Sequence, residues 1–156
     1  MKRLVLLVSI LVACAAAAAA TIGAAAGQPA TTLDLTSTMT SFRLAVGTKP
    51  GGAKPVRPSA GDLGYLTGKL FKGGKPFGRY TGVCAQLEGG NQQCTFVLGL
   101  PDGQIISTAG YGPGMNVGNI AHEAIVGGTG AYEGVRGQGD DRELGSKGQL
   151  HLHLLR

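Results

Sequence analysis

The chain has 156 residues, of which 28 are glycine and none is tryptophan, and its formal net charge is +5 at pH 7. So much glycine penalises helices, and beyond the N-terminal leader no stretch is apolar at helical spacing for three turns. The basic residues are spread through expected loops without interleaved aromatic residues, a pattern that argues against nucleic acid as a partner.

The N-terminus has the layout of a secretory signal. Residues 1–3 are a short basic start, an uncharged apolar stretch follows, and an A-x-A pattern at 24–26 predicts cleavage near residue 26. We therefore expect a signal peptide over 1–26, with an approximate cleavage site, and a secreted protein. A retained anchor is an alternative, although a run rich in alanine spans a bilayer less well than one of leucine. A second alternative is the lipobox-like segment 11–14, which would lipidate Cys14 and so anchor the chain at the cell surface.

Residues 27–156 suit one compact domain. Short β-rich runs bounded by turn residues recur along it, which is typical of an antiparallel sandwich or barrel. The expected strands are residues 33–46, 61–71, 77–87, 92–100, 103–110, 120–126, 131–138 and 147–155.

The connections between these runs predict closure of the sheet. Residues 72–75 contain two adjacent glycines, and residues 88–91 and 100–103 combine glycine with asparagine, aspartate or proline, so these segments predict three hairpins. Closing the sheet removes exposed strand edges, so we expect an all-β fold, an eight-stranded antiparallel β-barrel. Two segments interrupt the pattern: the Pro/Gly/Lys-rich segment 47–60, an expected exposed loop, and segment 110–119, whose Tyr111, Met115 and Val117 could fold over a barrel mouth.

Two cysteines follow the leader, at positions 84 and 94. Strands on either side of 88–91 would place them opposite each other, within the short Cα separation that a disulfide requires. An exported protein meets an oxidising compartment, so we expect a Cys84–Cys94 disulfide. The alternatives are a thiol nucleophile or half of a metal site, but the chain has no C-x-x-C pattern and too few cysteines for structural zinc.

A glycine-rich segment lies behind a short apolar run, with the sequence AIVGGTGAYEGVRGQ at 124–138. A dinucleotide-binding loop would need a further glycine where Glu133 stands and a helix after it, and neither is present in the sequence pattern. We therefore expect a corner between two strands, with glycines that permit a tight turn or a close backbone approach. These glycines are Gly127, Gly128, Gly130, Gly134 and Gly137.

The same segment resembles the signature of the allene oxide cyclase-like and dirigent-like β-barrel superfamily, a G-G-T-G-x-Y-x-G-V-x-G corner late in the chain. The matching residues are Gly127, Gly128, Thr129, Gly130, Tyr132, Gly134 and Gly137. The preceding order of GDLGYLTGKLF, GKPFGRYTGVC and QCTFVLGLPDGQI is similar to the exported bacterial, actinobacterial-type branch. The resemblance covers residues 61–138.

The resemblance implies a barrel around an apolar cavity, often assembled as a homotrimer. Plant members cyclise an allene oxide or guide stereoselective coupling, and some bacterial members close spiro rings, largely by positioning a reactive substrate. We expect a small apolar molecule in the lumen and no cofactor. We expect the barrel to bind this molecule without converting it. The first alternative is catalysis as a cyclase or isomerase, and the second is a structural or surface-interaction module whose lumen is filled by side chains.

Several side chains are candidates for the site. His122 and Glu123 precede the glycine corner, and a buried glutamate there would have a raised pKa and could act as a general acid or base. The alternative places both on the outer face or rim. Candidate ligand-binding residues are Tyr65, Tyr80, Tyr111 and Arg136, each of which could instead lie at the surface.

Two histidines alternate with leucines near the C-terminus. His151 and His153 share one face of a strand, and such a pair can bind zinc or copper only with further ligands. We expect them to face solvent, and we expect no metal site.

Overall fold

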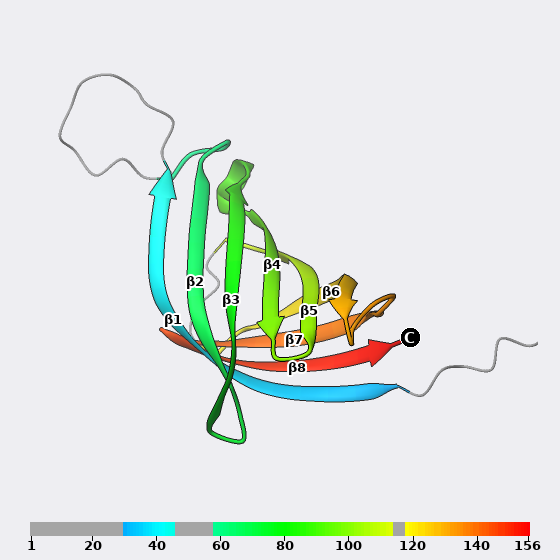
Figure 1. Cartoon of the computed structure of the whole chain (residues 1–156). Coiled ribbons are helices and arrows are strands. Elements are labelled where there is room, and N and C mark those ends of the chain that lie inside the picture. Colours follow the sequence, from blue (N-terminus) through cyan, green and yellow to red (C-terminus); the bar gives the residue numbers. More distant parts are fainter. Residues whose placement is uncertain (1–29, 46–57, 114–117) are drawn as a thin grey trace, which may run out of the picture.

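Apolar and polar residues alternate along most strands, so each strand can bury one face, and a closed sheet turns these faces into a lumen. The structure, a computed structural model, describes residues 30–45, 58–113 and 118–156. Eight antiparallel strands form one closed barrel in chain order, with β8 paired to β1 (Figure 1). The strands are β1 (Thr31–Ala45), β2 (Leu63–Lys72), β3 (Lys75–Gln86), β4 (Gln92–Leu100), β5 (Gly103–Tyr111), β6 (Ile120–Gly130), β7 (Arg136–Leu144) and β8 (Lys147–Leu155), and a short 3-10 turn, η1 (Glu88–Gly90), precedes β4. The expected fold class is confirmed.

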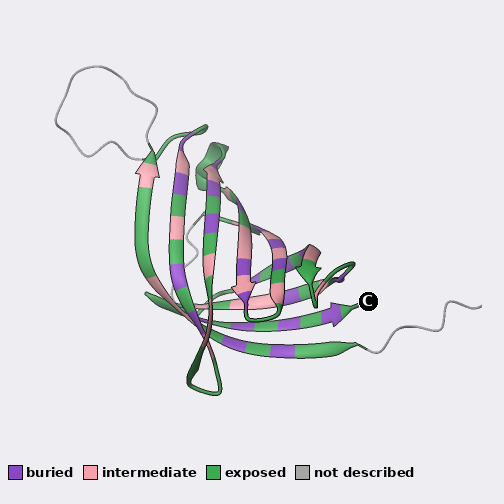
Figure 2. Cartoon of the chain, viewed as in Figure 1, coloured by how far each residue is buried: buried purple, intermediate pink, exposed green. Residues whose placement is uncertain are grey.

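Buried and exposed residues alternate along the strands, most regularly in β8 (Figure 2). The side chains that point into the barrel are mostly leucines at one end, where they form the core. Toward the other end they include larger polar and aromatic residues. The core cluster contains Leu33, Leu35, Leu70, Leu98, Leu100, Ile105, Ile125, Val135, Leu150, Leu152 and Leu154. This core fills one half of the lumen, and the other half holds the site described below.

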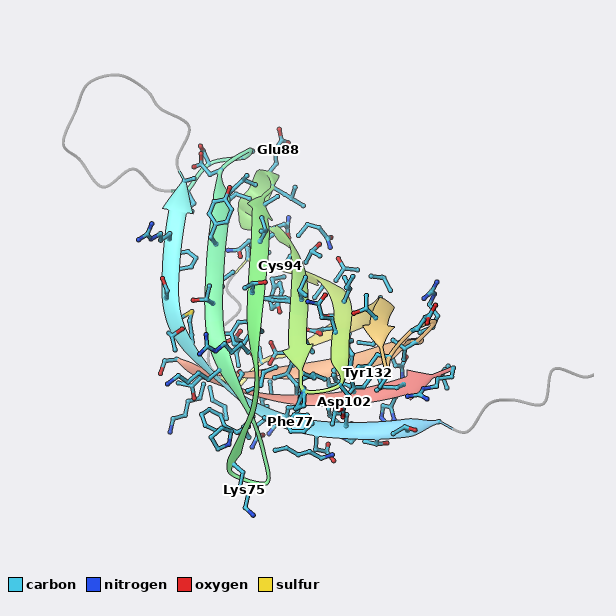
Figure 3. All side chains as sticks on the ribbon, viewed as in Figure 1. Lys75, Phe77, Glu88, Cys94, Asp102 and Tyr132 are labelled. Carbon is cyan, nitrogen blue, oxygen red and sulfur yellow. A yellow bond between two sulfur atoms is a disulfide. The ribbon has the colours of Figure 1, made fainter. Side chains whose placement is uncertain are left out.

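Figure 3 gives the two ends of the barrel. Asp102 in the β4–β5 turn and Tyr132 after β6 lie at the core end, where the Ala131 amide donates to the Asp102 carbonyl at 2.8 Å. Glu88 of η1 lies at the opposite end, and Cys94 lies between them on β4.

The Cys84–Cys94 disulfide is present. The two residues are direct cross-strand partners on β3 and β4, with their Cα atoms 4.0 Å apart. The intervening hairpin turns at Gly89 and Gly90, both with positive φ, as its sequence predicts.

The glycine corner differs from the expectation. Strand β6 runs through the predicted corner to Gly130, because residues 127–130 stay paired with β5. The chain turns only after Gly130, and β7 begins at Arg136, so the predicted strand 131–138 was wrong in position. Position 128 requires glycine because neighbouring backbone atoms approach it closely. A Cβ there would lie 2.5 Å from the Tyr132 carbonyl oxygen and 2.6 Å from that of Gln104.

Other predictions concern residues outside the described ranges. They are the signal peptide at 1–26, lipidation at Cys14, most of the 47–60 loop, and a mouth-covering role for Met115 and Val117. Within the described ranges, no helix is long and apolar enough to cross a membrane.

Candidate functional site

A cavity of about 520 Å³ occupies the half of the lumen that the leucine core leaves open. Leu98 and Leu150 of the core lie at its floor, and Gly90 of η1 and Ser146 of the β7–β8 turn lie where it reaches the barrel end. The volume is within the range of small-molecule sites, about 300 to 1,000 Å³. Side chains therefore fill only part of the lumen.

One wall of the cavity is apolar and aromatic. Met39, Phe42 and Leu66 come from β1 and β2, and Phe96 comes from β4. The Phe96 ring meets the rings of Tyr80 and Tyr111 edge to face, each with a centroid separation of 6.4 Å. Such packing holds the rings in fixed orientations and presents a rigid surface to a ligand.

The facing wall carries three carboxyl groups. Glu123 comes from β6, and Asp141 and Glu143 come from alternate positions of β7, which point to the same side of the sheet. Glu123 pairs with Gly139, so Asp141 is its diagonal cross-strand neighbour. Glu123 is only 4% exposed, and among the described residues none of the three carboxyls forms a salt bridge.

Burial shifts these carboxyls toward their protonated forms. The pKa of Asp141 rises from 3.8 to about 7, first through burial and then through the charges of Glu123 and Glu143. Burial also raises the pKa of Glu123, which the nearby Ser107 hydroxyl partly opposes, and it raises the pKa of Glu143. At neutral pH the lumen therefore holds carboxyls that can both donate and accept a proton.

The tyrosines beside the carboxyls remain protonated. Burial, followed by the charges of Asp141 and Glu143, raises the pKa of Tyr80 to about 12. Burial and the same acidic neighbours raise the pKa of Tyr111 still further. Both hydroxyls are thus available as hydrogen-bond donors to a bound molecule.

Four buried polar atoms in this region have no hydrogen-bond partner among the described residues: Ser107 Oγ, Tyr111 Oη, Glu123 Oε2 and Asp141 Oδ1. The Tyr111 hydroxyl lies near enough to Asp141 to favour its ionised form, but the two do not meet in hydrogen-bonding geometry. A buried polar group without a partner costs about 1–3 kcal/mol, so such groups mark sites where a bound molecule or proton is expected.

The site residues predicted from the sequence fall into two groups in the structure. Tyr80, Tyr111 and Glu123 line the cavity. Tyr65 and Arg136 do not line it: Tyr65 is 44% exposed, and Arg136 is exposed and donates from Nη1 to the Val135 carbonyl at 2.8 Å.

The histidines lie on the outer face. His122 Nδ1 is 2.7 Å from Asp140 Oδ1, so His122 points away from its neighbour Glu123 and the lumen. His151 Nδ1 contacts Asp34 Oδ1, and its ring meets that of His153 edge to face. In the described part of the chain, no group of three or more His, Cys, Asp or Glu residues could hold a metal ion.

Sequence reasoning missed Asp141 and Glu143. Both lie in GDDREL, a polar segment that follows the expected strand 131–138 and was assigned to no strand. The spacing of Gly139, Asp141 and Glu143 could have revealed them, because every second residue of an extended segment points to the same face of the sheet. The Ser107 side chain, on the inward row of β5, was missed for a different reason: it lies in the predicted strand 103–110, but a small polar residue gives no distinct pattern.

No protein-family model and no curated protein matches the sequence. The fold is similar to several solved structures. A pyocyanin demethylase is 22% identical, with a TM-score of 0.64, and the match covers 80% of this chain and 99% of that one. The pterocarpan synthase dirigent protein PsPTS1 is 16% identical, with a TM-score of 0.62, covering 83% of this chain and 97% of that one.

The Diels Alderase AbmU from Streptomyces koyangensis is also similar. It is 16% identical, with a TM-score of 0.60, and the match covers 90% of this chain and 72% of that one. At these identities the likeness concerns the fold alone. The chain therefore has the barrel fold of dirigent proteins and of cyclases of this kind.

Proposed function

We propose that this protein is an exported barrel that holds a small, mostly apolar molecule in its lumen and catalyses its cyclisation or isomerisation. Glu123 and Asp141 exchange protons with the bound molecule, while the aromatic wall fixes its conformation. Tyr80 and Tyr111 orient its polar atoms through their hydroxyls. No cofactor enters this scheme.

One observation carries the proposal: two neighbouring carboxyl residues line a largely apolar cavity, and each has a buried oxygen without a hydrogen-bond partner among the described residues. The pKa of Asp141, about 7, makes this carboxyl partly ionised at neutral pH, when it can accept a proton. The more buried Glu123, whose pKa is also raised, can donate one. Because the two groups interact, their protons belong to the pair, and catalysis requires only that one member is protonated while the other is not.

The rest of the cavity supports a positioning role. The edge-to-face rings and the disulfide in the cavity wall make its shape rigid. Holding a flexible substrate close to its reactive geometry can contribute about 7 to 11 kcal/mol in the best cases. Solved structures with this fold include a protein described as a Diels Alderase and one described as a pterocarpan synthase dirigent protein, which agrees with such chemistry.

Export is supported by the predicted leader and by the disulfide, which persists in oxidising compartments.

Retention of a ligand without reaction is the second candidate function. The rigid, disulfide-bonded wall favours it, because a storage site needs shape but no proton transfer.

The test begins with native mass spectrometry of the protein isolated from its own host. A co-purifying mass absent after denaturation would identify the ligand or product, and related compounds from the same culture extract would then be assayed for turnover. We expect Glu123→Gln and Asp141→Asn each to lower turnover by about 100-fold or more, in the range of general acid–base contributions. Asp140→Asn is the matched control, because Asp140 faces outward and should leave turnover unchanged.

Three outcomes separate the alternatives. Turnover that depends on both carboxyls supports the cyclase or isomerase. A bound molecule that is never converted supports retention alone. A protein that stays empty after incubation with the culture extract contradicts both.

A further inference from the structure

The charges in the lumen are unbalanced. Its polar wall carries the carboxyls of Glu123, Asp141 and Glu143, and among the described lining residues Lys147 is the single cation. Lys147 is exposed at the start of β8, forms no salt bridge with another described residue, and is not among the groups that shift the pKa of Asp141. The described residues therefore place acceptors in this cavity without supplying a positive charge that pairs with them.

The acceptors belong to two residues that line the cavity. Glu123 is only 4% exposed, and its Oε2 atom has no hydrogen-bond partner among the described residues. Asp141 Oδ1 is likewise buried and unpartnered. A buried charge without a partner is costly, and such groups are normally paired with a cation or a strong donor.

The aromatic wall of the cavity suits the same kind of ligand. Tyr80, Phe96 and Tyr111 form a chain of edge-to-face rings beside the carboxyls. Aromatic rings attract cations through their electron-rich faces, and the attraction grows when water is excluded. A cationic nitrogen between the rings and the carboxyls would be stabilised from both sides.

We propose that the lumen selects a small molecule whose apolar skeleton carries a basic nitrogen, and that Glu123 and Asp141 bind this nitrogen as its protonated form. The inference rests on the proposed function for the location of the ligand, and it adds the chemical class. If the nitrogen arrives unprotonated, the Asp141 carboxylic acid transfers its proton to it, which leaves an ammonium paired with a carboxylate. An anionic ligand is disfavoured by repulsion from the same groups.

Three probes of one size and different charge test the selection: naphthylmethylamine, naphthalenemethanol and naphthoic acid. Their binding is measured by isothermal titration at neutral pH, with the amine cationic, the alcohol neutral and the acid anionic. A hydrogen bond to a charged group contributes enough for the amine to bind about 10- to 100-fold more tightly than the alcohol. The acid should bind most weakly.

Substitutions test which carboxyl groups cause the preference for the amine. Glu123→Gln and Asp141→Asn should each remove most of the preference for the amine while leaving the affinity for the alcohol nearly unchanged. Asp140→Asn, on the outer face, should behave as the unmodified protein. A general loss of packing would instead weaken the amine and the alcohol equally.

The preference should also depend on pH. Among the residues that the structure describes, the ionisable groups that line the cavity are Tyr80, Tyr111, Glu123, Asp141, Glu143 and Lys147. Of these, Asp141 titrates near pH 7, so the preference for the amine should grow as pH rises through about 7. In Asp141→Asn this increase should be lost.

The outcomes distinguish the inference from the function on which it rests. Equal binding of the amine and the alcohol would overturn the basic-nitrogen class and leave lumen binding intact. Tightest binding of naphthoic acid, lost in Lys147→Gln, would overturn it in favour of an anionic ligand. Binding of none of the probes, together with a protein that stays empty in culture extract, would overturn both.

Discussion

Replacing the Asp141 carboxyl with the neutral amide of asparagine measures how much the buried charge of Asp141 lowers the free energy of unfolding. Burial, followed by the charges of Glu123 and Glu143, raises the pKa of Asp141 from 3.8 to about 7 in the folded protein. In the unfolded chain the carboxyl is exposed and returns to its ordinary pKa of about 3.9. Between these two values the folded protein holds a proton that the unfolded chain releases, so the free energy of unfolding falls as pH rises.

The magnitude follows from the two pKa values. Each pKa unit corresponds to about 1.4 kcal/mol, so a difference of about 3 units lowers the free energy of unfolding by about 4 kcal/mol between about pH 4 and pH 8. Asp141→Asn lacks this group. It should match the unmodified protein below about pH 4, where the carboxyl is protonated in both the folded and the unfolded states, and exceed its stability above neutrality by an amount approaching that difference.

Urea unfolding followed by circular dichroism, with the disulfide intact, measures the free energy of unfolding at each pH. Asp140→Asn is the control: it removes a neighbouring carboxyl that pairs with His122 on the outer face, and should lose about 1 kcal/mol or less without changing the slope. If the curves for Asp141→Asn and the unmodified protein run parallel from acid to alkaline pH, Asp141 titrates normally and the reasoning is refuted.

Three further predictions concern the frame around the site. Gly128→Ala should destabilise the barrel strongly, because its Cβ would lie 2.5 Å from a backbone oxygen, whereas Gly112→Ala meets nothing within 4 Å and should be nearly neutral; equal thermal midpoints would contradict this. Reducing the Cys84–Cys94 disulfide, which closes a loop with a sequence separation of 10, should lower the free energy of unfolding by about 3 kcal/mol in the chain-entropy account. Urea titrations with and without reductant measure this, and coincident curves would show that the hairpin is equally constrained without the bond. Leu152→Ala, at a core position with 0% exposure, should cost about 2–5 kcal/mol in the same assay, and a cost below about 1 kcal/mol would mean that the core collapses around the gap.

The strands that the sequence predicted best are those with strong local signals. β4 (Gln92–Leu100) and β8 (Lys147–Leu155) have the predicted bounds, because turn residues delimit them and apolar residues alternate within β8. The disulfide was also predictable, since a tight hairpin turn places its two cysteines opposite each other.

The strand that failed is the one that carries the chemistry. β7 (Arg136–Leu144) contains GDDREL, whose polar residues have low strand propensity, and only pairing with β6 and β8 makes it extended. The sequence could therefore raise Glu123 as a candidate but not the carboxyls that accompany it. It left open which of His122 and Glu123 faces inward, because that depends on the register between strands.

By itself the sequence determined the class of fold, most of the strands and the covalent bridge. These follow from local periodicity and turn chemistry, which act over a few residues. Only the tertiary structure decided that Glu123, Asp141 and Glu143 share one cavity with Tyr80 and Tyr111, and that Tyr65, Arg136 and His122 stay outside. A shift of one residue in register exchanges the two faces of a strand, so the composition of the lumen is set by long-range pairing around the closed barrel.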